Sequence, residues 1–107
     1  MGYPLENALF QWEEGGRTLQ GIDETRERRL ADRVVAAVQD ELRRRIGPTF
    51  AAAELAELYA RGTDWCQQVA LDVAPGLATD PQSIADAAFW LYLRGATDFA
   101  GGRRLPV

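Results

Sequence analysis

One long segment, residues 23–46, constrains the fold more than any other part of the chain. Its apolar residues recur every three or four positions, which is the spacing of one helical face. They are Ala31, Val34, Val35, Val38, Leu42 and Ile46. The Gly47-Pro48 pair then ends the pattern, because proline does not continue a helix. The segment therefore predicts a long amphipathic helix whose apolar stripe has to be buried against other helices.

The charges of this segment fit a helix that begins at Asp23. Asp23 is a suitable N-cap, Glu24 and Glu27 lie near the positive end of the helix dipole, and Arg43–Arg45 lie near the negative end. Pairs in which an acidic residue precedes an arginine by four positions also favour this helix. These pairs are Glu24 with Arg28, Asp40 with Arg44, and Glu41 with Arg45.

Start and stop signals divide the rest of the chain into further helices at 50–61, 64–74 and 80–94. Thr49 and Asp64 are expected caps, and Asp80 precedes a proline suited to the first helical position. The last helix ends at Gly95 or continues through Phe99, and residues 101–107 are expected to form a flexible tail.

Residues 1–22 allow two interpretations. Leu5, Ala8, Leu9 and Trp12 have helical spacing, so the first is a short helix that ends at Gly15-Gly16. The second is a hairpin of two short strands around the same glycines. Two strands alone are marginally stable, so a hairpin would have to pack against the helices.

Together these segments predict an all-α protein, a compact bundle of four to five helices in a single domain, residues 1–107. The chain has 107 residues, 47% hydrophobic and 26% charged, as is usual for one soluble domain. Its longest apolar run, residues 87–93, is far shorter than the roughly 20 residues that span a bilayer. With one cysteine no intrachain disulfide is possible. We therefore expect a cytoplasmic protein with no membrane segment.

The side-chain inventory argues against catalysis. The chain has no histidine and no lysine, and its only thiol is Cys66. A catalytic cysteine normally needs a base such as histidine, so we interpret Cys66 as a buried hydrophobe beside Trp65. We expect no cofactor, no metal and no catalytic residue. A metal site made only of carboxylates, supporting a weak enzyme, remains a minor hypothesis.

Binding is the function that the composition favours. Aromatic residues and arginine are enriched in interface hot spots, and we expect partner-binding residues among two groups. The aromatic group is Trp90, Tyr92 and Phe99, and the basic group is Arg26, Arg29, Arg33, Arg43 and Arg44. The leading hypothesis is a small non-enzymatic protein-protein interaction module, an adaptor or regulatory subunit, that binds another protein or itself.

The alternative is a nucleic-acid-binding, transcription-associated protein that uses helix 23–46. Seven arginines there face six acidic residues, so the segment is nearly neutral. A helix-turn-helix across residues 54–72 fits poorly, because its supposed recognition helix, residues 64–72, has two acids and no arginine. Nucleic acid is therefore an unlikely partner, though not an excluded one.

Overall fold

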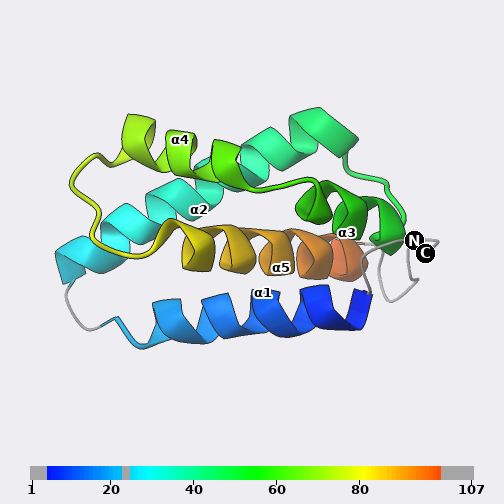
Figure 1. Cartoon of the computed structure of the whole chain (residues 1–107), viewed down its shortest axis with the longest axis horizontal. Helices are drawn as coiled ribbons and strands as arrows, with labels where there is room; N and C mark the ends of the chain where they lie inside the picture. The colour runs from blue at the N-terminus through cyan, green and yellow to red at the C-terminus, as the bar shows by residue number, and fades with distance from the viewer. Residues whose placement is uncertain (1–4, 23–24, 100–107) are drawn as a thin grey trace.

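The computed structural model describes residues 5–22 and 25–99, and the side chains of residues 7–22 and 25–95. Within these ranges the chain forms five helices and no strand (Figure 1). They are α1 (Leu5–Gln20), α2 (Thr25–Ile46), α3 (Ala52–Ala60), α4 (Asp64–Val73) and α5 (Pro81–Phe99). The all-α prediction is confirmed, with one compact domain of radius of gyration 13.4 Å.

Helix α5 is the central element of the bundle. It packs against each of the other four helices, with α1 on one side and α4 on the other (Figure 1). Residues 84–89 are accordingly all buried, so this part of α5 is covered on every face. Around α5 a single core cluster draws on all five helices. In the described residues no helix combines the length and hydropathy that a membrane span requires.

Helix α1 corrects the prediction for residues 1–22. The segment is helical, so the hairpin is wrong, and the helix runs through Gly15-Gly16 to Gln20. Glycine inside a helix costs up to about 1 kcal/mol relative to alanine, so local propensity favours a stop there. Packing overrides it, because Gly15 is buried against α5 and Trp12, one turn earlier, is 0% exposed.

Helix α2 confirms the predicted stripe. Ala31, Val34, Val35, Val38 and Leu42 are buried, and Ile46 is half-buried beside them. The helix ends at Gly47, whose amide nitrogen donates to the Arg43 carbonyl (2.9 Å) and whose φ of 78° suits glycine. The expected Asp23 cap and the Glu24–Arg28 pair lie outside the described residues.

The starts of the last three helices follow the predicted signals only in part. Helix α5 begins at Pro81 as expected, and Asp80 Oδ2 accepts a hydrogen bond from the Ser83 amide (3.2 Å). The N-cap of α3 is Ala51 rather than Thr49, and Glu54 accepts a bond from its amide (2.9 Å). Helix α4 has Thr63 as its N-cap rather than Asp64. Helix α5 continues past Gly95 to Phe99, and the 101–107 tail lies outside the described residues.

Candidate functional site

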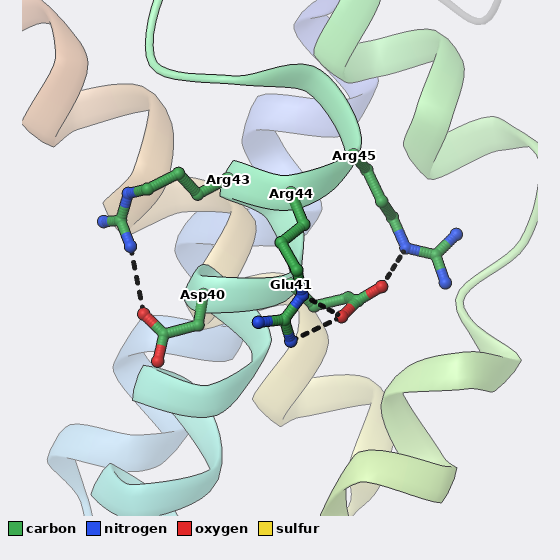
Figure 2. Close-up of polar contacts among 5 residues, drawn as sticks. All are labelled: Asp40, Glu41, Arg43, Arg44 and Arg45. Atoms are coloured by element: carbon green, nitrogen blue, oxygen red, sulfur yellow. Dashed lines mark hydrogen bonds and ion pairs between the residues drawn. The ribbon is translucent and has the colours of Figure 1, made fainter.

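The three arginines at the end of α2 are paired with two acids of the same helix (Figure 2). Arg43 bonds Asp40 (3.0 Å), whereas Arg44 (2.8 Å) and Arg45 (3.0 Å) share Glu41. The Glu41–Arg45 pair is as predicted, but Arg44 bonds Glu41 rather than Asp40. Hydrogen bonds from Arg44 first, and then Arg45, lower the pKa of Glu41. Arg43 and Arg44 are therefore poorer candidates for an external anion than their sequence suggests.

Arg45 also holds two helices together. Its guanidinium lies 4.3 Å from the ring centroid of Trp65 on α4, a cation–π contact. The same side chain is bonded to Glu41 of α2, so α4 is tied to the C-terminal half of α2.

The other arginine candidates, on the N-terminal half of α2, are exposed. Arg26, Arg29 and Arg33 lie on the helix face opposite the buried stripe. Among the described residues, none of the three makes a hydrogen bond or an ion pair. Within the described ranges they are thus the arginines of α2 that are not bonded to another group.

Glu27 performs a role that the sequence did not reveal. Its carboxylate accepts hydrogen bonds from the amides of Ala78 (3.0 Å) and Thr79 (2.7 Å) and from the Thr79 hydroxyl. The hydroxyl bond is the main cause that lowers the pKa of Glu27. The first turn of α2 thereby holds the connection between α4 and α5, which lies about fifty positions away along the chain.

Tyr92, one of the aromatic candidates, is part of the core. It is 7% exposed, it stacks on Phe50 with 5.4 Å between ring centroids, and its hydroxyl donates to the Gly47 carbonyl (2.7 Å). Burial raises the pKa of this phenol. Tyr92 therefore gives no free surface to a partner. The Phe99 side chain lies outside the described residues, and Trp90 is half-buried at the surface.

Trp90 lies in a groove of about 460 Å³ between α1, α2 and α5. Leu19 of α1, Val35 of α2 and Ala87 of α5 form its buried base, and Trp90 and the 42% exposed Leu91 extend the apolar surface outward. Polar side chains complete the lining. They are Glu13, Arg17, Gln20, Arg28, Asp32 and Arg94.

The cations of this groove differ in how they are held. Arg28 donates to the Leu19 carbonyl (2.9 Å) and is paired with Asp32 (3.4 Å). Arg17 is paired with Glu14 (3.2 Å). Arg94 is exposed at the end of the lining and has no hydrogen bond or ion pair within the described part of the chain.

A buried polar cluster joins three helices on the other side of α5. Asp86, 7% exposed, accepts hydrogen bonds at Oδ1 from the Tyr59 hydroxyl (2.5 Å) and from Gln82 Nε2 (2.9 Å). The Tyr59 hydroxyl also lies 2.8 Å from Gln11 Oε1 of α1. Desolvation raises the pKa of Asp86, and the bonds from Tyr59 and Gln82 oppose that rise.

An aromatic cluster packs beside these polar groups. The Trp12 ring is 5.4 Å from Tyr59 and 5.6 Å from Phe89, measured between centroids, and Trp65 is 6.3 Å from Phe89. The indole nitrogens of Trp12 and Trp65 are buried and find no hydrogen-bond acceptor among the residues that the structure describes. Trp12, Tyr59 and Phe89 are therefore core residues, whereas Trp65 and Trp90 are half-buried and Phe10 is 62% exposed.

Cys66 has the properties of a packing residue. It is fully buried, and desolvation is the main cause that raises the pKa of its thiol to about 12. A thiol with so high a pKa is almost entirely protonated at neutral pH and is a poor nucleophile. Within the described ranges no group of three or more acidic or thiol side chains is arranged to hold a metal ion.

Comparison with known proteins gives no match, whether to a protein family, to a curated protein or to a solved structure.

Proposed function

We propose that this chain is a small non-enzymatic interaction module, an adaptor or regulatory subunit, that holds a segment of a partner protein in the groove between α1, α2 and α5. One observation carries the proposal. Trp90 combines a large apolar surface with access to solvent, and the exposed Arg94 lines the same groove. Tryptophan and arginine are the residue types that most often dominate binding energy at interfaces. We also place the protein in the cytoplasm, where a single buried thiol is unexceptional.

The shape of the groove supports a polypeptide ligand. Its volume, about 460 Å³, accommodates several side chains, and its lining includes solvent-exposed residues such as Leu91, which is 42% exposed. Small-molecule sites usually enclose most of the ligand surface. An open groove between helices suits a segment that stays partly in solvent and is anchored by a few residues.

A second candidate is nucleic-acid binding through α2, and the exposed side chains of Arg26, Arg29 and Arg33 favour it. The remaining arginines of α2 are bonded to groups of this chain. Three phosphate contacts would give a slope of about −3 in a plot of log affinity against log salt. A salt titration with a mixed-sequence duplex tests this candidate, and no binding at low salt eliminates it.

The groove proposal is tested by photo-crosslinking at two exposed leucines. A benzophenone amino acid replaces Leu91, in the groove, or Leu71, which is 54% exposed on α4 on the opposite side of α5 (Figure 1). In extract from the source cells we expect a discrete adduct from position 91 at several times the yield from position 71. Equal yields from both positions contradict a groove-specific partner.

The same adduct should disappear when Trp90 is replaced by alanine. Trp90 is only half-buried, so we expect this change to cost clearly less than the roughly 3 to 5 kcal/mol of a fully buried tryptophan. The thermal melt of the variant separates the two interpretations. Loss of the adduct with a folded variant supports a binding role for Trp90, whereas a large fall in the melting temperature shows that it is a core residue.

A further inference from the structure

We infer that the outer face of α2 is a second interaction surface, which binds a short helix of another protein whose carboxylates are spaced three or four residues apart. The surface consists of an arginine row, Arg26, Arg29 and Arg33. These residues lie on the face of α2 opposite the buried stripe, and none of them lines the groove around Trp90. The arginine row is therefore separate from the groove and goes beyond the proposed function.

Like charges lie next to each other in the arginine row. Arg26 and Arg29 are three positions apart, and Arg29 and Arg33 are four positions apart, so their side chains are neighbours on the helix surface. Such pairs destabilise a helix about as much as pairs of opposite charge stabilise it. The other four arginines of α2 are each bonded to groups of this chain. An arrangement that lowers stability, in a helix that elsewhere pairs its arginines, is expected at a binding surface.

The acids of α2 do not compensate this row. The positions three and four residues from Arg33 hold Arg29, Leu30, Ala36 and Ala37, none of which is acidic. The acids closest to Arg26 in sequence, at positions 23 and 24, lie outside the described residues, so Arg29 and Arg33 define the surface. The four acids of α2 itself are bonded to other groups. They are Glu27, Asp32, Asp40 and Glu41.

The length of the arginine row favours a helix over a nucleic acid as its partner. The row spans about 10 Å of helix, and double-stranded DNA carries one negative charge per about 1.7 Å of its axis. Three cations would thus face about six phosphates. The carboxylates of Asp32 and Asp40, both more than half exposed, lie beside the row and beyond its end. A long polyanion meets these acids, and the net charge of −4 also repels it.

A short acidic helix fits the arginine row more closely. Successive arginines are offset along α2 by about 4.5 and 6 Å, the rise of three and four helical residues. Carboxylates with the same spacing on a second helix therefore meet the guanidinium groups in register. Ala36, exposed one turn beyond Arg33, has a side chain small enough for an apolar residue of the ligand to cover it.

Two labelled synthetic helices of identical composition test this partner by fluorescence anisotropy at low salt. One has glutamates at positions i, i+3, i+4 and i+7, on a single face, and the other has the same residues in an order that distributes the glutamates around the helix. We expect the first peptide to bind the full chain at least about fivefold more tightly. Arg33→Glu should remove most of this difference. Arg61→Glu, the same change of charge at an exposed arginine of α3, should leave it.

The melting temperature shows whether Arg33→Glu remains folded. It should equal or exceed that of the wild type, because the introduced carboxylate faces Arg29 four positions away. Equal binding of the two peptides, or binding of neither, contradicts a helix-binding surface. Tighter binding of a mixed-sequence DNA duplex, abolished by Arg33→Glu, assigns the arginine row to nucleic acid instead. The adduct from position 91 should form equally in Arg33→Glu, so failure here is distinguishable from failure of the groove.

Discussion

Replacement of Gly15 by alanine is expected to lower the free energy of unfolding by about 2 kcal/mol or more, whereas the same change at Gly16 should raise it by about 0.5 to 1 kcal/mol. A Cβ on Gly15 would lie 2.6 Å from the Ser83 carbonyl oxygen and 3.0 Å from the Ala87 amide nitrogen, and closer still to Cβ of Asp86. Two of these atoms belong to the α5 backbone. The clash is relieved only if α1 and α5 separate, which weakens contacts along both helices.

Gly16 is the matched control, because the two glycines are adjacent in α1. A Cβ there meets only Cδ1 of Trp90, at 3.9 Å, which is an ordinary van der Waals contact. Both substitutions gain the same helix propensity, so the difference between the variants isolates the close approach of α1 to α5. Urea unfolding monitored by circular dichroism measures both values. Equal stability of the two variants would show that the helices are farther apart at Gly15 than described.

The same glycines show why the fold could be predicted while one helix end could not. The stripe of α2 and the Asp80-Pro81 start of α5 are local signals, and both are confirmed. The low helix propensity of glycine predicts that α1 ends at Gly15-Gly16. The helix continues there because Gly15 packs closely against α5, which lies about seventy residues later in the chain. A position that requires glycine for close packing has the same sequence appearance as one that requires it for a turn.

The sequence names Trp90, Tyr92 and five arginines of α2 among its partner-binding candidates, and their binding role stays a prediction. Trp90 was identified as an interface candidate, and it lies in the groove. The aromatic run of α5 did not reveal that Tyr92 faces Phe50, because a helix surrounded on nearly all sides has no periodic polar face to orient it. Likewise, charge spacing identified the Glu41–Arg45 pair within α2. It could not identify the bonds of Glu27 to Ala78 and Thr79, since these join segments distant in the chain.

Asp86 supplies the second large effect, a stability term that decreases as pH rises. Its pKa in the folded protein is raised, chiefly by desolvation, above the ordinary value for aspartate of about 3.9. Between these two pKa values the folded state binds more protons than the unfolded state. The free energy of unfolding therefore falls with increasing pH across this window and is constant above it, as far as Asp86 is concerned. Glu27 acts in the opposite direction, because its pKa is lowered and its contribution is lost as pH falls.

The substitution Asp86→Asn separates these opposing contributions. An asparagine Oδ1 can still accept the bonds from Tyr59 and Gln82, whereas the buried charge is gone. We expect the free energy of unfolding of the variant, minus that of the wild type, to increase as pH rises from about 4 and then to level off. Asp86→Ala, in contrast, should destabilise by about 1 to 3 kcal/mol, because it also removes the acceptor for Tyr59 and Gln82.

Urea denaturation between about pH 3.5 and 8 measures these differences, and the carboxyl carbon resonance of Asp86 reports its titration directly. Asp64→Asn is the control for the loss of one negative charge, since Asp64 is exposed on α4. A difference between Asp86→Asn and wild type that is flat or decreases with pH would contradict the burial of Asp86. A rise with pH for Asp86→Asn, absent from Asp64→Asn, would show that ionisation of the buried Asp86 carboxylate opposes folding. The hydrogen bonds from Tyr59 and Gln82 would then be what stabilises this carboxylate where α1, α3 and α5 meet.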